Sequence, residues 1–296
     1  MAPPLLAVPN VSEGRDADRI AGLRQAFADG TSLLDVHSDP DHDRTVLTLG
    51  GQPEALREAL VRGAVAAIEA IDMDHYAGLH PAIGALDVCP LVWLAQADRD
   101  AAVATAIEVA AAIGELGVPV FLYGDLAIGP DRVERAYFRS GGLAELWLRM
   151  EGGGLVPDRG PELPHRTAGA TLVTARPPLA AFNVELEGGD LDGARSIAAG
   201  LRESGGGLPG VRAIGLPLSS GRMQVSTNIH NPLAVPLGEV VERIRALAEP
   251  LGARAVEAEL VGLVPAAALE GYPLDVPIRD FDPELRIVEK RLTTLP

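Results

Sequence analysis

The predicted secondary structure repeats one order along the chain, and this repetition constrains the fold more than any other feature. From Leu5 to Leu94 the apolar pattern predicts strand, helix, strand, strand, helix, strand, followed by a further helix and strand. From Ala181 onward the same order recurs. That order is the signature of the ferredoxin-like fold. The sequence therefore predicts an α/β (α+β) chain with two ferredoxin-like subdomains, each a mixed sheet with helices packed on one face.

The element boundaries follow from apolar periodicity, helix caps and glycine or proline breaks. The predicted helices cover about residues 16–29, 53–71, 99–116, 131–150, 190–204 and 237–251. The predicted strands cover about residues 5–8, 32–36, 45–49, 85–94, 118–123, 170–175, 181–187, 211–218, 221–229 and 253–261. Short helical pieces are expected near 266–269 and 284–291.

The segment from Glu151 to Gly169, EGGGLVPDRGPELPHRTAG, is rich in glycine and proline and has few apolar residues. Its composition is typical of a linker. It also carries two arginines and a histidine, and long ordered loops are often functional. We expect an N-terminal subdomain over residues 1–178 and a C-terminal subdomain over residues 179–296.

The charge pattern excludes several classes of protein. The net charge is −16, and Lys290 is the only lysine. A P-loop requires Gly-Lys-Ser/Thr and a pyridoxal enzyme requires a Schiff-base lysine, so neither class is expected. No basic stripe is available to neutralise phosphates, so nucleic acid is not an expected partner. Arginine remains available for anions, since its guanidinium suits bidentate contacts with carboxylates.

Cysteine content and the lengths of the apolar runs indicate a cytoplasmic protein. Cys89 is the only cysteine, which excludes an internal disulfide and a cysteine-rich zinc site and fits a reducing compartment. No apolar run reaches the about 18 residues of a membrane span. The start, MAPPLLAVPN, lacks the basic region and long apolar stretch of a signal peptide. We therefore expect no membrane association.

The polar loop from His37 to Arg44, HSDPDHDR, contains two histidines and three aspartates. Alternating aspartates open a calcium loop, but Arg44 stands where that loop needs glycine and Gly50 where it needs glutamate. The calcium interpretation therefore fails. Three alternatives remain: a transition-metal site, which needs matched geometry as well as ligands, a solvated polar loop, and a substrate-binding loop that acts through Arg44. We favour the last two.

The segment from Gly78 to Pro90, GLHPAIGALDVCP, holds one histidine beside a predicted buried strand. Pro81 restricts the backbone of His80 to an extended conformation, and Gly84 permits a turn or a close backbone approach. An imidazole held in this way suits proton transfer at neutral pH. The alternative is a histidine that only caps a turn, and spacing alone does not separate the two.

Several stretches resemble motifs of one enzyme family and occur along the chain in the same order as in that family. They are VPNVSEGRD, LLDVHSDPDHDRTVLTLGG, HPAIGALDVCPL, LGVPVFLYG, PDRGP, AGATLVTAR, FNVEL, VRAIG, QVSTNI and ELVGLVPAAAL. Over nearly its whole length the chain resembles the glutamate formimidoyltransferase (formiminotransferase domain) family. The resemblance implies a folate-dependent one-carbon group transferase of histidine degradation. Such an enzyme transfers the formimino group from N-formiminoglutamate to N5 of the co-substrate tetrahydrofolate, releases glutamate and forms a homodimer.

The resemblance also implies roles for particular residues. His80 matches the catalytic histidine of the family, and Arg44, in the motif DRT, matches an arginine near the active site that we expect to bind substrate. The folate-binding segment matches Gly160, Pro161, Glu162, Leu163, Pro164, His165, Arg166, Thr167, Ala168 and Gly169. A neutral imidazole can take a proton from one nitrogen of a tetrahedral intermediate and give one to the other. Neither a metal nor a covalent nucleophile is required, so Cys89 is expected to be a small core residue.

Three positions depart from the family pattern. Ala82 stands where the family usually has arginine, His37 where it has a carboxylate near the reaction centre, and Asp43 where it usually has asparagine. Two explanations of Ala82 remain open: another arginine such as Arg44 or Arg166 binds the donor, or the preferred donor carries less negative charge. A family relative that binds folate or a related ligand without this transferase activity is therefore the alternative function.

Overall fold

The computed structural model describes residues 5–79 and 81–293, so His80 lies outside the described residues. The chain divides by its internal contacts into two compact units, Met1–Arg176 (unit 1) and Pro177–Pro296 (unit 2). Each unit has its own sheet and its own hydrophobic core.

In the described part of unit 1, seven strands form one mixed sheet in the order β3-β4-β1/β2-β5-β7-β6. The strands are β1 (Leu5–Ala7), β2 (Asn10–Val11), β3 (Ser32–Asp39), β4 (Arg44–Gly51), β5 (Leu86–Val92), β6 (Val120–Leu122) and β7 (Thr171–Arg176). β1 and β2 form one interrupted strand that pairs antiparallel with both β4 and β5. The interruption contains Pro9, which has no N–H to donate to a ladder. β7 pairs parallel with β5 and β6 and extends the sheet beyond the ferredoxin-like set.

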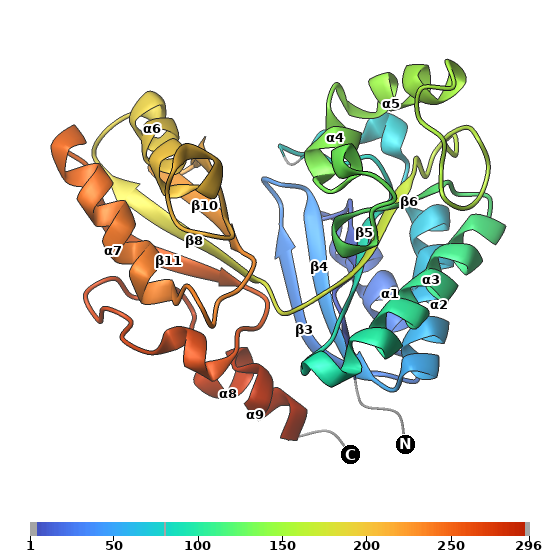
Figure 1. Ribbon diagram of the computed structural model, residues 1–296, viewed down its shortest axis with the longest axis horizontal. Coiled ribbons are helices and arrows are strands. Elements are labelled where there is room, and N and C mark those ends of the chain that lie inside the picture. The colour runs from blue at the N-terminus through green and yellow to red at the C-terminus, as the bar shows by residue number, and fades with distance from the viewer. Residues whose placement is uncertain (1–4, 80, 294–296) are drawn as a thin grey trace. The chain divides into compact units, whose positions relative to one another are not determined.

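Helices cover both faces of this sheet (Figure 1). They are α1 (Ala17–Ala28), α2 (Pro53–Ala70), α3 (Arg99–Glu115), α4 (Arg135–Arg139) and α5 (Gly142–Glu151). α1, α2 and α3 share a core with Cys89 and Val173, whereas α4 and α5 share a core with Val88 and Leu172. These adjacent strand residues enter opposite cores because side chains alternate across a strand. α4 and α5 thus occupy the face of the sheet opposite the other three helices.

The ends and the packing of α1 follow from its sequence. Asp16 Oδ1 accepts hydrogen bonds from Asp18 N (3.1 Å) and Arg19 N (3.0 Å), which satisfies two backbone donors at the start of the helix. Phe27 is fully buried against α2, where a Cβ added to Gly63 would lie 2.1 Å from the Phe27 ring. Glycine at position 63 therefore lets the two helices approach each other closely.

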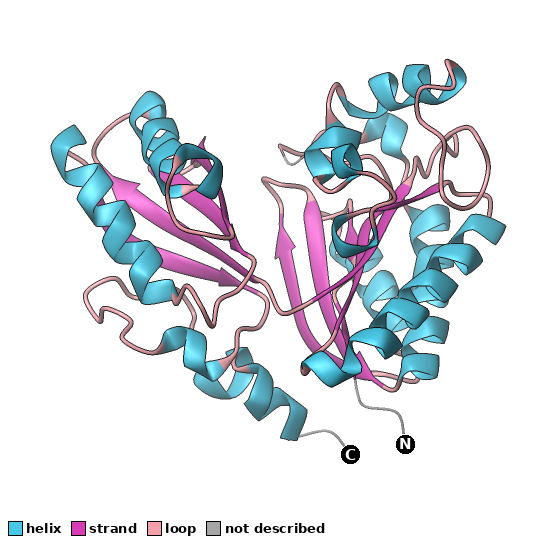
Figure 2. Cartoon of the chain, viewed as in Figure 1, coloured by secondary structure: helices cyan, strands magenta, loops and turns pink. Residues whose placement is uncertain are grey.

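Unit 2 contains a four-stranded antiparallel sheet in the order β11-β8-β10-β9, with helices on one face (Figure 2). Its elements are β8 (Ala180–Glu187), α6 (Leu191–Leu201), β9 (Val211–Pro217), β10 (Met223–Ile229), α7 (Leu237–Ala248), β11 (Arg254–Val261), α8 (Pro283–Arg286) and α9 (Val288–Thr293). α6 and α7 pack on the sheet, and α8 and α9 belong to the C-terminal tail. The predicted ferredoxin-like order is confirmed in this unit, and β1 to β5 of unit 1 follow it as well.

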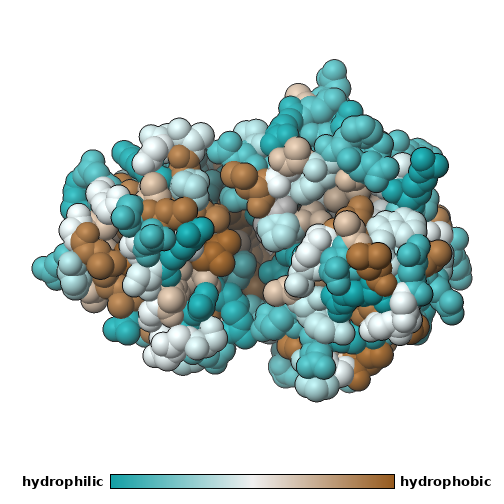
Figure 3. Space-filling model, turned by 90° about the horizontal axis from the view of Figure 1, so that it is seen from above, coloured by the Kyte–Doolittle hydropathy of each residue, from teal (hydrophilic) through white to brown (hydrophobic). Residues whose placement is uncertain are grey.

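The predicted helix at 131–150 is broken into α4 and α5, as its two glycines indicate. Gly141 has a φ of 74°, a left-handed conformation that interrupts the helix. Among the described residues every helix is too short or too polar to cross a bilayer. Hydrophobic residues on the face drawn in Figure 3 are interspersed with hydrophilic ones, and scattered exposed hydrophobic residues are normal for a folded protein.

Candidate active site

The segment that follows His80 is buried from Ile83 onward and is fixed by hydrogen bonds. Ser12 Oγ donates to Gly84 O (2.7 Å), and Ile83 N donates to Asp87 Oδ1 (2.9 Å). Ile83 is fully buried, and Asp87 is only 2% exposed. Two side chains, Ser12 directly after β2 and Asp87 of β5, therefore fix the course of the backbone after position 80.

The end of the 160–169 loop lies directly against this segment. Ala170 N donates to Ile83 O (2.9 Å), and Ala85 N donates to Ala168 O (2.9 Å). The two stretches thus form a short antiparallel ladder. The structure brings the end of the predicted folate-binding segment next to the residues that follow the predicted catalytic histidine.

This close approach depends on two glycines. A Cβ added to Gly84 would lie 1.9 Å from Ala170 O. Gly169 has a φ of +66°, and a Cβ there would lie 2.1 Å from Ile83 O. Any larger residue at either position would push the two segments apart, so glycine at both positions is a condition for this arrangement.

The rest of the 160–169 loop has a fixed start and an exposed middle. A Cβ added to Gly160 would lie 2.6 Å from Val118 O, so the start of the loop is packed against the backbone of Val118. His165 Nδ1 accepts a hydrogen bond from Ala168 N (3.1 Å), which closes a tight turn. The exposed residues are Gly160, Pro161, Glu162, Leu163 and Arg166; His165 and Thr167 are half-buried; Pro164, Ala168 and Gly169 are buried.

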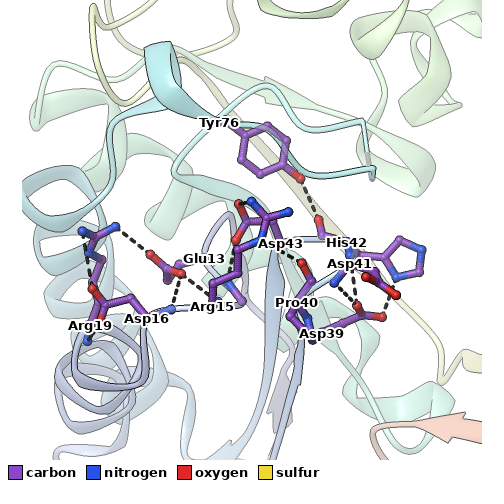
Figure 4. A network of polar contacts seen from close by, with 11 residues as sticks. Glu13, Arg15, Asp16, Arg19, Asp39, Pro40, Asp41, His42, Asp43 and Tyr76 are labelled. Carbon is purple, nitrogen blue, oxygen red and sulfur yellow. Dashed lines mark hydrogen bonds and ion pairs between the residues drawn. The ribbon is translucent and has the colours of Figure 1, made fainter. Parts of the chain in front are cut away.

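The 39–44 turn is attached to the residues that lead into position 80. Tyr76 Oη donates to His42 O (2.9 Å) (Figure 4). In addition, Leu79 N donates to Asp41 O (3.1 Å). Two hydrogen bonds from consecutive parts of one segment to one turn hold them side by side. The structure therefore places the polar loop beside the segment that contains His80.

Asp43 fixes the point where this turn becomes β4. Its φ is 49°, a left-handed conformation, and its Oδ1 accepts a hydrogen bond from Gly14 N (3.0 Å). Its other oxygen, Oδ2, lies 3.2 Å from Arg15 Nη1. Arg44 follows as the first residue of β4 and is half-buried. A side chain that leaves a strand at a fixed turn is well positioned to bind a substrate.

Asp39 and His42 form a pair with each other. His42 Nδ1 lies 2.6 Å from Asp39 Oδ2, and Asp39 Oδ1 accepts from Asp41 N and His42 N (both 2.9 Å). Burial raises the pKa of Asp39, but the hydrogen bonds from His42 and from the backbone outweigh it and hold that pKa below its usual range. Among the residues that the structure describes, no three His, Cys, Asp or Glu side chains gather as metal ligands.

α4 brings two further arginines near Arg44, and sequence reasoning missed both. Burial, together with the charges of Arg135 and Arg139, lowers the pKa of Arg44, while Asp39 and Asp87 act in the opposite direction. The pattern ERAYFRS contains no motif that separates these arginines from surface ones. The available signal was two arginines four residues apart in a short helix of an acidic chain.

Asp87 connects α4 to the segment after His80. Its Oδ2 pairs with Arg139 Nη2, while its Oδ1 accepts the Ile83 N–H described above. The side chains of Arg139 and Asp87 are 8% and 3% exposed. The sequence showed Asp87 only as a polar interruption of an apolar strand. The structure shows that one buried carboxylate holds both the helix and the loop.

Both units match models of one family. The model described as formiminotransferase domain, N-terminal subdomain, matches residues 5–176. The model described as formiminotransferase domain matches residues 181–271. The two matches follow the two units of the structure.

Similar proteins match over most of the chain. Glutamate formimidoyltransferase of Streptococcus pyogenes serotype M1 is 39% identical over 302 residues, which cover 99% of each chain. Glutamate formimidoyltransferase of Thermoplasma acidophilum is 38% identical over 88% of each chain. Formimidoyltransferase-cyclodeaminase of Rattus norvegicus is 38% identical over 88% of this chain and 50% of its own length.

Proposed function

The chain belongs to the formiminotransferase family, and from that premise we propose that it transfers the formimino group from N-formiminoglutamate to N5 of tetrahydrofolate. Glutamate is the other product, and the reaction is a step of histidine degradation. One structural observation carries the proposal. The turn that ends at Arg44, the segments on both sides of His80 and the 160–169 loop are hydrogen-bonded to one another within unit 1.

His80 is proposed as the general acid–base. N5 of tetrahydrofolate attacks the formimino carbon, and the new N–C bond gives a tetrahedral intermediate. The imidazole accepts the proton from N5 and returns a proton to the glutamate nitrogen as the original C–N bond breaks. An imidazole with a pKa of about 6.5 can serve in both steps at neutral pH. The fixed backbone after position 80 supports this role, because a general base must be held within hydrogen-bond reach.

Binding roles follow for the other predicted residues. Formiminoglutamate is a dicarboxylate, and we propose that Arg44 holds one of its carboxylates, since arginine binds carboxylates with two parallel hydrogen bonds. We propose that the 160–169 loop, with its anchored ends and exposed middle, binds tetrahydrofolate as the co-substrate. No metal ion takes part in this scheme.

The proposal extends to the location and assembly of the protein. We propose a cytoplasmic homodimer that acts on small molecules. The single buried cysteine supports a reducing compartment. The homodimer rests on the family resemblance alone.

The test is steady-state turnover of formiminoglutamate with tetrahydrofolate, for the wild type and for His80→Ala. We expect His80→Ala to lower kcat by roughly 10²–10⁴-fold and to leave folate binding intact, as for other general acid–base groups. His75→Ala is the matched control, because His75 is 84% exposed and its Nδ1 pairs only locally with Asp72.

Two outcomes would contradict the assignment. A loss below about tenfold in His80→Ala removes His80 from the general acid–base role. Folate binding by a wild type that shows no turnover would instead favour the alternative, a family relative that binds folate or a related ligand without the transferase activity.

A further inference from the structure

Arg135, at the start of α4, has no carboxylate of its own. It is half-buried, and it makes no hydrogen bond or ion pair with any residue in the described ranges 5–79 and 81–293. Its contact is with an aromatic ring: Arg135 Cζ lies 6.0 Å from the centroid of Tyr123. Arg139, one helical turn later, is by contrast paired with Asp87. A half-buried guanidinium without a counter-ion is an uncommon feature of a folded protein.

Positive charge is also in excess around it. After burial, the charges of Arg135 and Arg139 are the largest causes that lower the pKa of Arg44, so both lie near it. The carboxylates that act on Arg44 are Asp39, which is bonded to His42, and Asp87, which is bonded to Arg139. Like charges gathered in one region destabilise each other unless an anion neutralises them. This concentration stands out in a chain whose net charge is −16.

Arg135 lies near the proposed reaction centre through a short series of contacts. Asp87 accepts a hydrogen bond from Ile83 N, three residues after His80, and pairs with Arg139. Arg135 and Arg139 are four residues apart on α4, so their Cβ atoms lie on the same side of the helix, about 5–6 Å apart. Arg135 therefore leaves the same side of α4 as Arg139, which is connected through Asp87 to the segment that follows position 80.

Tyr123 supplies a second donor at this place. It is 8% exposed, and its hydroxyl makes no hydrogen bond with a described residue. Burial raises the pKa of Tyr123, so the hydroxyl keeps its proton at neutral pH and can donate. The Arg135 guanidinium lies over the ring that carries this hydroxyl, and a guanidinium and a hydroxyl can both donate to a carboxylate.

We propose that Arg135 and the Tyr123 hydroxyl form a carboxylate-binding subsite that selects dicarboxylic donors over monocarboxylic ones. Arg44 takes one carboxylate of the donor, and the Arg135–Tyr123 subsite takes the other. The identity of the donor rests on the proposed function, whereas the subsite itself is a property of unit 1 that binding measurements can test directly.

The first experiment measures binding without turnover. Isothermal titration calorimetry compares glutarate, a dicarboxylate, with butyrate, a monocarboxylate, for the wild type and Arg135→Gln. We expect the wild type to prefer glutarate, and Arg135→Gln to lower glutarate affinity by about tenfold to 150-fold, the usual range for a lost charge-assisted hydrogen bond. Arg135→Lys should restore part of the affinity, because it keeps the charge but loses the two-pronged contact.

Arg24→Gln is the matched control, since it removes the same charge from an exposed position on α1. Tyr123→Phe provides an independent test that removes a single oxygen, with an expected loss of about three- to tenfold. Wild-type preference for butyrate or for neither ligand overturns the subsite. Equal glutarate affinity in Arg135→Gln and the wild type overturns it as well.

The second experiment compares N-formiminoglutamate with N-formiminoglycine as donors for tetrahydrofolate. The ratio of their kcat/KM values should fall at least about tenfold in Arg135→Gln, mostly through KM. An unchanged ratio overturns the subsite while the proposed function stands. Glutarate binding that depends on Arg135, in a protein that turns over neither donor, supports the subsite and refutes the proposed function.

Discussion

The two arginine clusters of this chain are balanced in opposite ways. In unit 2, Arg222 Nη1 lies 3.1 Å from Glu185 Oε2 and 3.5 Å from Glu257 Oε2. Arg279 Nη2 lies 2.6 Å from Glu257 Oε2 and also pairs with Glu185. Two guanidiniums meet two carboxylates, and the hydrogen bonds that Arg279 donates to Glu257 and Glu185 raise its pKa.

In the cluster of unit 1 the arginines outnumber the carboxylates that act on Arg44. The carboxylates that raise the pKa of Arg44 against the charges of Arg135 and Arg139 are Asp39 and Asp87, and each of the two already has a bonded partner. The pKa of Arg44 is lowered by burial and by the other two arginines, the reverse of the shift at Arg279. The same residue type therefore experiences opposite electrostatic environments in the two units.

This difference in charge balance distinguishes a cluster with a structural role from one that binds an anionic ligand. A cluster with matched charges is complete in the free protein, and its interactions contribute to folding. A cluster with surplus positive charge is stabilised only when an anion binds. The balance of charges, rather than the number of arginines, indicates which cluster is functional.

The largest expected effect comes from removing Asp87, the buried carboxylate that pairs with Arg139 in unit 1. Asp87→Ala leaves the guanidinium of Arg139 buried without its partner and the Ile83 N–H without its acceptor. Breaking a buried ion pair in this way costs about 3–5 kcal/mol of the free energy of unfolding. Cys89 is a probe for this change, because it is buried in unit 1 and burial raises its pKa to about 12, so alkylation at pH 8 reports opening of the core.

Urea unfolding followed by Cys89 alkylation measures the loss in unit 1 alone. Asp74→Ala, an exposed aspartate in the same unit, should stay within about 0.5 kcal/mol of the wild type. A loss below about 1 kcal/mol in Asp87→Ala would show that the pair is not a structural link between α4 and the loop.

Much of the fold could be predicted from the sequence, because local signals decide it. Asp16 caps α1, Pro53 opens α2, and Gly141 breaks the helix between α4 and α5. The side of the sheet on which α4 and α5 pack could not be predicted from such local signals. It depends on which strand residues face which core, and hydrophobic runs such as β5 are apolar on both sides.

The parts of the candidate site that could be predicted are segments whose amino-acid composition is unusual. The charged 160–169 loop and the His80 segment are of this kind, and the structure brings their described residues together. Arg135, Arg139 and Asp87 were missed because each is ordinary within its own stretch. Their roles arise from contacts between residues about fifty positions apart, which no local pattern records. Asp39 and His42 suggested metal ligands, but they are bonded to each other in a turn.

The second prediction concerns Asp39, the other carboxylate that acts on Arg44 in unit 1. Its pKa in the folded protein is held below the usual value, so its charged form contributes its full stabilisation above about pH 3.9. This contribution is lost progressively as the pH falls from that value through the lower pKa of the folded state. Asp39→Asn should therefore cost about 2 kcal/mol at pH 6, and this difference should shrink steadily as the pH is lowered below about 3.9. Urea unfolding of both proteins across this range tests it, with Asp131→Asn as an exposed control. Parallel curves for the wild type and Asp39→Asn would contradict the linkage.

The third prediction tests the matched cluster of unit 2. Arg279→Gln removes hydrogen bonds to Glu185 and Glu257 and leaves the buried Glu185 with Arg222 alone. The side chain of Arg279 is 41% exposed, so solvent screening limits the loss to about 1 kcal/mol. Thermal unfolding measures it, and turnover should be unchanged. A variant as stable as the wild type would remove the structural role of this cluster.

The smallest effect on stability, and the sharpest contrast, is expected at Arg135. Arg135→Gln removes one of three like charges and breaks no hydrogen bond or ion pair with a described residue, so the free energy of unfolding should stay within about 0.5 kcal/mol of the wild type or rise slightly. Arg279→Gln, the same substitution in unit 2, is its matched comparison. When glutarate is present, the difference in free energy of unfolding between the wild type and Arg135→Gln should increase. The wild type gains stability from the bound ligand, and Arg135→Gln does not. A loss of more than about 1 kcal/mol in ligand-free Arg135→Gln would show that both clusters are structural, and the contrast between the two units would disappear.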